Sequence, residues 1–364
     1  MRPILTLLMS SAIFPGCGDK EPTDTSLDTE PVDSGDPTDT DTGTSGPCAT
    51  PAAIFIDADG DETDLTDALT TGEYTTLSEP GTLSVCPGTW FARLLLRADI
   101  EVVGLGAEPS ETVLSGGESG TILDLGGPRQ FTVRNLTLDR GAGLDVEHNS
   151  GGGGLYCEEN GTVTVEDVTF SNGFANDGAG MYAVRCTVEL TDTVFIDNLS
   201  EDDGGALTLW ESTATLRGVT FENNTALDGG AMALFSSDVS IEDTVIVDNV
   251  ASYFAGGIWQ YDSTLALRDV TLSGNLNSGP FGGGLWSYGS ATLERVAFTD
   301  NTVSGNGGGL YVYFDSEVSG TDCDFSGNSP DAIWTDDYSD EGGVSHTAGT
   351  GYSFQCGANT CWEK

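Results

Sequence analysis

The chain has 364 residues, enough for one or two ordinary domains, and carries 58 acidic residues against 12 Lys and Arg, a formal net charge of −46. Nucleic-acid binding requires basic side chains that displace counterions, so this charge excludes a nucleic-acid partner; it also disfavours a polyanionic ligand unless metal ions bridge the two. Fifty glycines and many Thr, Val, Asp and Asn favour strands and turns over helices.

Residues 1–17 have the features of an export signal. Arg2 provides a positive start, and an apolar core too short to span a bilayer follows it. The segment ends in Phe-Pro-Gly-Cys, which resembles the lipobox of bacterial lipoproteins, a family in which the Cys is lipidated and becomes the mature N-terminus. Phe14 and Pro15 depart from the usual aliphatic and small residues. The resemblance implies a lipid at Cys17, and an ordinary signal peptide with secretion is the alternative.

Residues 18–47 contain almost no apolar side chain. Such a segment cannot bury enough surface to offset the entropy lost on ordering, so we expect a disordered, acidic, Thr- and Asp-rich tether. Gly18 rather than Asp follows the Cys, so the inner-membrane retention signal known from some bacterial lipoproteins is absent. We therefore expect an exported protein at the outer membrane or cell surface that meets the membrane only through the lipid at Cys17.

Residues 48–335 are predicted to form one all-β domain, followed by a C-terminal cap or tail at 336–364. Short runs of alternating apolar and polar residues, each punctuated by Gly or Pro, are typical of half-buried strands. No helical periodicity appears after the signal. The first runs are 82–86, 100–106, 112–116, 121–125 and 131–138.

From Gly151 to Trp334 the sequence repeats itself every 25 to 27 residues. A Gly-Gly or Gly-Ala-Gly step followed by an apolar residue marks each repeat at Leu155, Met181, Ala206, Ala231, Ile258, Leu285 and Leu310. A second apolar landmark recurs at Phe170, Phe195, Phe221, Ile246, Leu272, Phe298 and Phe325. From Phe195 onward an Asn follows three residues later, at Asn198, Asn224, Asn249, Asn275, Asn301 and Asn328. Two landmarks on one period establish a repeat array.

Two family resemblances follow from these segments. The start of the array resembles the first coils of right-handed parallel β-helix proteins of the pectate-lyase-like superfamily. The resemblance rests on four runs in this order: Val-Cys-Pro-Gly-Thr-Trp, Ile-x-Val-Val-Gly-Leu-Gly, Thr-Val-Leu-Ser-Gly and Phe-Thr-Val-Arg-Asn-Leu-Thr-Leu. The Gly-Gly-apolar and Phe-x-x-Asn pairs resemble the repeats of the polymorphic outer-membrane proteins, a family of β-helix adhesins. The resemblance covers roughly 52–334 and implies a single-stranded right-handed parallel β-helix of roughly ten coils.

Stacked coils place equivalent residues in columns about 4.8 Å apart. The Phe landmark is then an internal apolar ladder, and the Asn landmark an amide ladder inside a turn. A third column alternates in charge from Arg217 to Glu294, which predicts ion pairs between neighbouring coils.

Large aromatic residues follow the Gly steps. If the apolar landmark points inward, the next residue points outward, as does the one two positions further on. In two coils this reasoning places Leu207 and Met232 outward. Flat rings at fixed spacing suit sugar rings or a protein partner, and a purely structural stack is the alternative. The candidate binding residues are Tyr156, Tyr182, Trp259, Tyr261, Trp286, Tyr288, Tyr311, Tyr313 and Trp334.

Acids collect in the turns before the Gly steps of consecutive coils. Converging carboxylates are ligands that Ca²⁺ prefers, although no Asp-x-Asp-x-Asn-Gly loop is present. A solvated acidic rim is the alternative to a Ca²⁺ site. The candidate ligands are Asp177, Glu201, Asp202, Asp203 and Asp228.

The cysteines other than Cys17 indicate an oxidising compartment. Two predicted bridges are Cys48 with Cys86, which flank the start of the array, and Cys157 with Cys186, on successive coils. The third joins Cys356 to Cys361 in the tail and leaves Cys323 free; the alternative pairs Cys323 with one of those two.

No catalytic residue is identified. The two His, His148 and His346, stand in no recognisable dyad or triad, and residues 48–335 contain no Lys. The preferred hypothesis is a non-catalytic surface lipoprotein whose β-helix presents an aromatic face to a polysaccharide or surface protein. The alternative is a polysaccharide lyase or glycoside hydrolase of the same fold, since two carboxylates suffice for glycoside hydrolysis.

Overall fold

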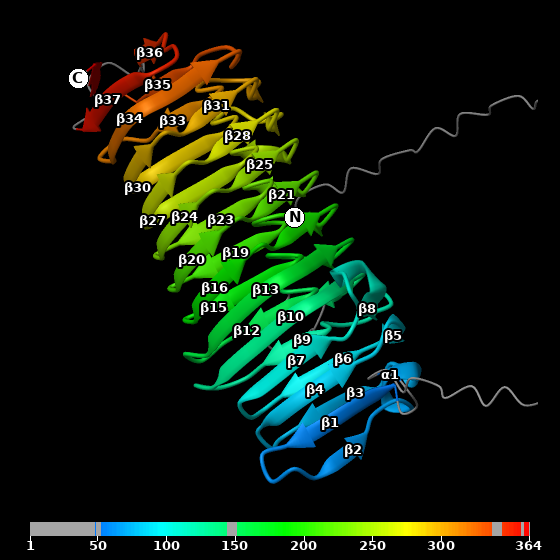
Figure 1. The fold of residues 1–364 in the computed structure, drawn as a ribbon. Coiled ribbons are helices and arrows are strands. Elements are labelled where there is room, and N and C mark those ends of the chain that lie inside the picture. The colour runs from blue at the N-terminus through cyan, green and yellow to red at the C-terminus, as the bar shows by residue number, and fades with distance from the viewer. Residues whose placement is uncertain (1–47, 49–51, 144–150, 337–343, 358–359, 364) are drawn as a thin grey trace, which may run out of the picture. The chain divides into compact units, whose positions relative to one another are not determined.

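The structure is a computed structural model that describes residues 48, 52–143, 151–336, 344–357 and 360–363. The predicted signal peptide and tether, with Cys17, lie outside these ranges. The described residues wind into about nine turns of a parallel β-helix, as the sequence predicts (Figure 1). Helices within the described ranges are limited to α1 (Ala68–Thr71) and the 3₁₀ helix η1 (Pro109–Glu111), and none is long and apolar enough to cross a membrane.

The coils between residues 123 and 303 repeat four strand positions in the same order, and the coils before and after them lack the fourth position. Equivalent strands of successive coils pair in parallel as four stacks. Stack 1 follows the Gly step and consists of β3 (Tyr74–Leu77), β6 (Arg93–Leu96), β9 (Leu123–Leu125), β12 (Leu155–Cys157), β15 (Met181–Val184), β19 (Leu207–Trp210), β23 (Met232–Phe235), the first halves of β27 (Ile258–Arg268) and β30 (Leu285–Glu294), β33 (Leu310–Val312) and β35 (Ile333–Thr335). Stack 2 consists of β4 (Gly81–Val85), β7 (Ile100–Gly104), the first halves of β10 (Gln130–Asp139) and β13 (Thr162–Ser171), β16 (Thr187–Thr191), β20 (Thr213–Arg217), β24 (Asp238–Glu242), the second halves of β27 and β30, and the first half of β34 (Glu317–Ser326).

The other two stacks complete each coil. Stack 3 consists of β5 (Gly88–Phe91), β8 (Thr112–Ser115), the second halves of β10 and β13, β17 (Val194–Ile196), β21 (Thr220–Glu222), β25 (Val245–Val247), β28 (Thr271–Ser273), β31 (Ala297–Thr299) and the second half of β34. Stack 4 is a separate sheet of β11 (Ala142–Gly143), β14 (Phe174–Ala175), β18 (Leu199–Ser200), β22 (Thr225–Asp228), β26 (Val250–Phe254), β29 (Leu276–Asn277) and β32 (Thr302–Val303).

Antiparallel strands close both ends of the stacks. At the start, β1 (Ala53–Asp57) pairs antiparallel with β2 (Glu62–Asp64) and with β4. At the end, β36 (Val344–His346) pairs with β35, and β37 (Tyr352–Gly357) pairs with both β34 and β38 (Thr360–Glu363). These pairings occupy edge groups that would otherwise accept another chain.

Corners between the stacks use left-handed backbone. The residue between stacks 2 and 3 has a positive φ in coil after coil, and Asn, Asp and Gly tolerate that region better than other residues do. This requirement explains the regular Asp residues that end stack 2. The corner residues are Asn135, Asp167, Asp192, Gly218, Asp243, Asp269, Arg295 and Asp322, with φ between 47° and 67°.

The two predicted inner ladders are confirmed. Phe170, Phe195 and Phe221 are in register and buried, with ring centroids 4.5 and 4.9 Å apart in successive pairs. In the amide ladder, Asn249 Nδ2 donates to Asn275 Oδ1 at 3.0 Å and to the Phe221 carbonyl at 3.0 Å. The same side-chain bond links every step from Asn198 to Asn328.

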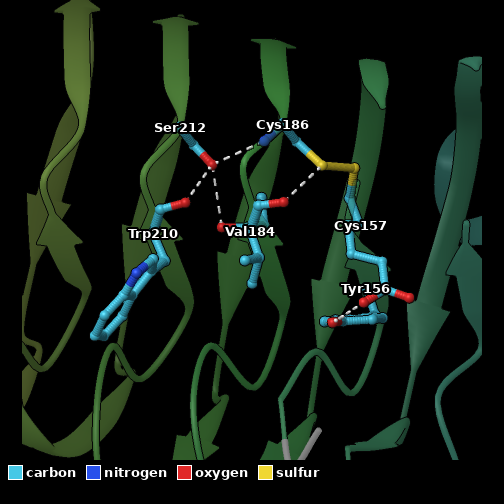
Figure 2. The surroundings of a disulfide bond; sticks show 8 residues. Tyr156, Cys157, Val184, Cys186, Trp210 and Ser212 are labelled. Atoms are coloured by element: carbon cyan, nitrogen blue, oxygen red, sulfur yellow. Dashed lines mark hydrogen bonds between the residues drawn. A yellow bond between two sulfur atoms is a disulfide. The ribbon is translucent and has the colours of Figure 1, made fainter. Parts of the chain in front are cut away.

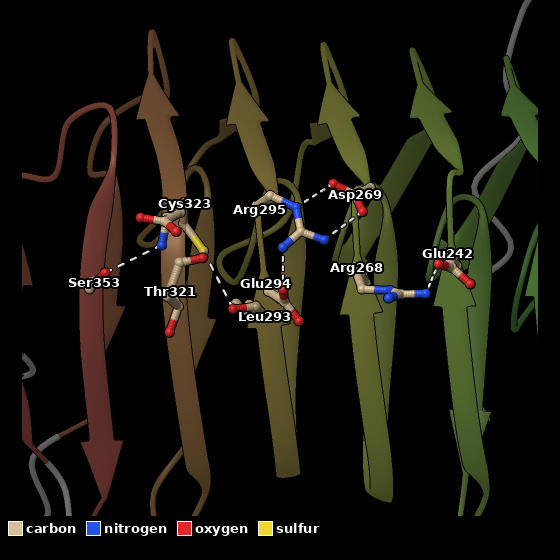
Figure 3. Close-up of polar contacts among 10 residues, drawn as sticks. Glu242, Arg268, Asp269, Leu293, Glu294, Arg295, Thr321, Cys323 and Ser353 are labelled. Atoms are coloured by element: carbon tan, nitrogen blue, oxygen red, sulfur yellow. Dashed lines mark hydrogen bonds and ion pairs between the residues drawn. The ribbon is translucent and has the colours of Figure 1, made fainter.

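The charged column forms ion pairs along stack 2, as predicted, with one difference. Glu242 bridges Arg217 and Arg268 from the two neighbouring coils, and Figure 3 shows its pair with Arg268. Glu294 instead pairs with Arg295 beside it, and Arg295 also donates to both carboxylate oxygens of Asp269 at 2.7 Å.

One part of the predicted strand register is wrong. Leu207 and Met232 pair with Met181 and Ile258 in register and are fully buried, so they belong to the inner column of stack 1. The outward positions of those coils are Thr208 and Ala233. The error arises because three small residues, not two, precede the inward residue, and Ala206 and Ala231 are the third of them.

Disulfides tie coils together. Cys157 of β12 bonds Cys186 on the next coil, and Ser212 Oγ accepts from the Cys186 backbone N–H at 3.0 Å (Figure 2). Cys48 bonds Cys86. Both bridges were predicted. Cys356 is also disulfide-bonded and lies opposite Cys361 in the β37–β38 register, while Cys323 is a buried free thiol among the described cysteines.

Candidate functional site

The predicted aromatic column runs along stack 1 through adjacent coils. Its register joins Tyr156 to Tyr182, then passes through Thr208 and Ala233 before it reaches further rings. In the later coils it continues as Trp259, Trp286, Tyr311 and Trp334. The sequence spacing therefore correctly places these rings in one column. The column contains two groups of rings, with the small side chains of Thr208 and Ala233 between them.

Most rings of this column are covered instead of open to solvent, as in the structural-stack alternative. Tyr156 and Tyr182 are each 8% exposed, Trp286 is 3% and Tyr311 is 2% exposed. Trp259, Tyr288, Tyr313 and Trp334 are half-buried, and Tyr261 alone among the nine candidates is exposed.

A second column covers the first and explains this burial. The residue before each Gly step lies at the corner between stacks 4 and 1, and these corners are linked from coil to coil by backbone hydrogen bonds. Five successive members of this corner column are Asp177, Asp203, Asp228, Phe254 and Phe281. The column is acidic over the early coils and aromatic over the later ones.

In the later coils the corner rings pack directly on the predicted column. Phe254 stacks on Trp259 with centroids 5.4 Å apart and an interplanar angle of 9°, and it also contacts Trp286 at 5.0 Å. Phe281 covers Tyr311 at 5.2 Å. The stripe is therefore half of a two-layer aromatic cluster rather than an open face.

This cluster lines a half-open hollow of about 440 Å³, which we call the aromatic hollow. It spans β26, β27, β30 and the coil that follows β33. Every described residue that lines it is aromatic: Tyr253, Phe254, Trp259, Tyr261, Phe281, Trp286, Tyr288, Tyr313 and Phe314. Five of them were predicted as binding residues. The described lining of the hollow therefore consists of nine rings with no aliphatic or basic side chain.

Two features mark the hollow as unusually constrained. The indole N–H groups of Trp259 and Trp286 are buried and have no hydrogen-bond partner in the described part of the chain, which costs about 1–3 kcal/mol for such a group. Ala255 occupies the left-handed corner, at φ 44°, where other coils have Gly. Ala255 belongs to one buried apolar cluster with Trp286 and Tyr311. Strained backbone of this kind clusters at binding sites.

The acidic half of the corner column gathers carboxyl groups. Oxygens of Asp177, Asp202 and Asp203 lie within 4.8 Å of one another. Burial and the charges of Asp177, Asp202 and Asp228 raise the pKa of Asp203 to about 8. Burial likewise raises the pKa of Asp177 and of Asp228 to about 6, although backbone N–H groups lower each.

The predicted Ca²⁺ ligands only partly converge. Glu201 is exposed and lies outside the group, and Asp228 Oδ1 accepts from the Phe254 backbone N–H at 2.8 Å. Ca²⁺ takes six to eight oxygen ligands, more than three carboxylates supply, and a carboxyl group that is protonated at neutral pH is a poor ligand. Ca²⁺ binding at Asp177, Asp202 and Asp203 stays a prediction.

The remaining candidates lie outside the aromatic hollow, and Tyr182 lies near the acidic corner. Tyr156 donates to Glu158 Oε2 at 2.9 Å, and the Tyr182 ring lies against Gly151, where burial and nearby Asp177 raise its pKa to about 12. His346 is on β36, and burial lowers its pKa. His148 lies outside the described residues.

Four lining residues escaped the sequence reasoning: Tyr253, Phe254, Phe281 and Phe314. Two of them had a signal, because Phe254 and Phe281 stand at the same offset before the Gly step as the three Asp residues. Tyr253 and Phe314 belong to none of the columns that the sequence repeat defines.

Comparison with known proteins defines the class. The profile of the right handed beta helix region matches residues 124–294, and that of the Chlamydia polymorphic membrane protein repeat matches residues 295–313. With the coils described above, the chain is a right-handed parallel β-helix protein in which residues 295–313 are similar to the polymorphic membrane protein repeat.

One solved structure is similar to this chain: PfbA, a surface adhesin of Streptococcus pneumoniae. The two are 11% identical over 82% of this chain and 91% of PfbA, with a TM-score of 0.21, at which the likeness supports no argument. No curated protein matches the sequence significantly.

Proposed function

We propose that this chain is a non-catalytic, surface-anchored β-helix lipoprotein that binds a glycan or a protein through the aromatic hollow. The observation that carries the proposal is the all-aromatic lining of that hollow. Aromatic rings offer large, rigid contact area, and they dominate binding energy where they are enriched at interfaces.

The scaffold suits this role because it fixes the rings before a ligand arrives. The hollow rests on strands that pair in register with the coils on both sides, as Trp259 does with Ala233 and Trp286. Rings held by such a lattice lose little conformational entropy on binding, which favours affinity.

Anchoring at the cell surface is the second part of the proposal. It rests on the lipobox-like Cys17 and the acidic tether, which lie outside the described residues, and on the similarity to a repeat of the Chlamydia polymorphic membrane protein. The lipid and the tether would hold the β-helix outside the membrane.

A glycan array and immobilised surface proteins test the binding function. We expect wild-type protein to retain at least one ligand and Trp259→Ala with Tyr261→Ala to lose it, since these two rings line the hollow and are not fully buried. Phe91→Ala, which removes an exposed ring from an early coil, is the matched control and should bind normally. Equal retention by the double variant and the wild type would refute the assignment of the site.

The acidic corner supports a second candidate, glycoside hydrolysis. Carboxyl oxygens of Asp177 and Asp203 lie within 4.8 Å of each other, and a retaining glycosidase acts with two neighbouring carboxyl groups. A pKa of about 8 keeps Asp203 protonated at neutral pH, as a general acid requires. Release of reducing sugars from a polysaccharide panel, abolished in Asp203→Asn, would favour this function over binding alone.

A further inference from the structure

The walls of the aromatic hollow cross one another instead of lying parallel. The Tyr261 and Tyr288 rings meet at 63° with centroids 5.1 Å apart, and Tyr288 and Tyr313 meet at 88° and 5.6 Å. Trp259 and Trp286 are inclined at 57°. A flat platform would suit one face of a sugar, whereas crossing rings present several faces toward one volume.

The charge around the hollow is negative. Asp336 Oδ1 accepts from the Tyr311 hydroxyl at 2.6 Å, beneath the Phe281 wall, and Asp228 is bonded to the backbone of Phe254. Asp262 follows Tyr261 on the exposed side. These acids add to a chain whose net charge is −46.

Basic side chains of the same coils are engaged elsewhere. Arg268 pairs with Glu242, and Arg295 pairs with Asp269 and Glu294, all along or beside stack 2. None of the described lining residues of the hollow is basic. An anionic group there would meet repulsion and no counter-charge, while a cation would meet ring faces and a favourable field.

We infer that the aromatic hollow is a cage for an organic ammonium ion and that a quaternary ammonium group is its ligand. The inference rests on the proposed function, because it names the chemistry bound at the same site. A quaternary ammonium has no N–H to satisfy, so a lining of rings alone is sufficient for it, and its diffuse charge is attracted by the negative ring faces. The four lining tyrosines offer hydroxyl groups to a sugar, but a neutral sugar would gain nothing from the negative field around the hollow.

Calorimetric titration of the folded protein with choline chloride tests the inference. The comparison ligand is 3,3-dimethyl-1-butanol, which has the shape of choline but no charge, and sodium chloride at equal ionic strength controls for screening. We expect saturable choline binding and binding of the neutral alcohol weaker by about tenfold or more.

Three variants separate the ring faces from other contributions. Tyr261→Leu and Tyr313→Leu keep apolar bulk but remove the π system, so each should weaken choline binding severalfold. Tyr313→Phe keeps the ring and loses only the hydroxyl, so it should bind choline like the wild type. Phe91→Leu is the control outside the hollow, and thermal unfolding confirms that each variant is folded.

The outcomes distinguish this inference from the proposed function. Equal affinity for choline and the neutral alcohol overturns the cation cage but leaves a binding hollow. Absence of choline binding, with a glycan or protein retained through Trp259 and Tyr261, overturns the cage alone. Absence of every ligand overturns both.

A quaternary ammonium occurs both as a free solute and as a lipid headgroup. Sedimentation with phosphatidylcholine vesicles separates these sources, provided that the choline titration saturates. Co-sedimentation that free choline competes away identifies the headgroup as ligand, and its absence identifies the free solute.

Discussion

At the scale of single residues, many acids of this chain have a backbone role. Asp192, Asp243 and Asp269 each adopt a positive φ at the corner between stacks 2 and 3, and Asp197 and Asp248 do so one corner later. Asp tolerates this conformation at lower cost than most side chains. Part of the net charge of −46 therefore follows from the number of corners that the coils require.

Asn249→Ala tests the amide ladder. Asn249 is fully buried, donates to Asn275 and the Phe221 carbonyl, and accepts from Asn224, so its loss leaves several buried groups unsatisfied. We expect the free energy of unfolding to fall by roughly 2–4 kcal/mol, measured by urea denaturation. Ser240→Ala, at an exposed position of β24, should change it by less than about 0.5 kcal/mol. Equal effects of the two substitutions would show that the ladder is dispensable.

The raised pKa of Asp203 predicts that acid stabilises the corner column. The folded pKa of about 8 lies above the ordinary value of 3.8, so the folded state binds the proton more tightly than the unfolded state. The destabilising effect of the carboxylate is full above about pH 8 and declines as the pH falls from about 8 toward 4. Asp203→Asn should raise the Tm by a few degrees above pH 8 and have little effect near pH 4.

The control for this experiment is Glu201→Gln, which removes one negative charge from an exposed neighbour. It reports general charge repulsion without a buried carboxyl group. A Tm difference between Asp203→Asn and wild type that does not vary with pH, or that Glu201→Gln reproduces, would contradict the assignment.

At the scale of strands and coils, the inner columns were predictable because they depend only on period and alternation. The positions of Phe170 and Asn198 each recur with a fixed repeat period, and stacked coils place residues of one period in one column. The outer face was not predictable by the same argument. Whether Trp286 is open depends on where the corner before the Gly step directs Phe254, and that direction follows from a left-handed turn at Ala255, which alternation does not report.

The disulfide between β12 and the next coil should contribute measurably to stability. It joins cysteines 29 residues apart, and such a crosslink restricts the unfolded chain by about 2–4 kcal/mol. Cys157→Ala with Cys186→Ala should lower the urea midpoint accordingly under oxidising conditions. Cys323→Ala, which removes a buried sulfur without a bridge, is the matched control and should have a smaller effect. A double variant as stable as this control would show that the coils alone fix the geometry.

At the scale of the whole molecule, the proposed lipid at Cys17 would place the hollow at a membrane surface. If Cys17 is lipidated, fatty-acid label should appear on the wild-type protein and be absent from Cys17→Ala, which should leave the membrane fraction. Cys323→Ala should remain labelled and membrane-bound. Labelling of Cys17→Ala would refute the lipid anchor, and secretion of both proteins would favour an ordinary signal peptide.

The common register of the coils has a consequence for how this gene can change. Each coil from Met181 to Leu310 meets its neighbours through the same pairs, so the loss or duplication of one whole repeat would preserve both the ladders and the antiparallel ends. A repeat lost or gained at the coils that contain Thr208 and Ala233 would shift the hollow along the stack, relative to Cys86, by about 4.8 Å per coil. The distance of the hollow from Cys86 can therefore change without a change in the residues that line the hollow.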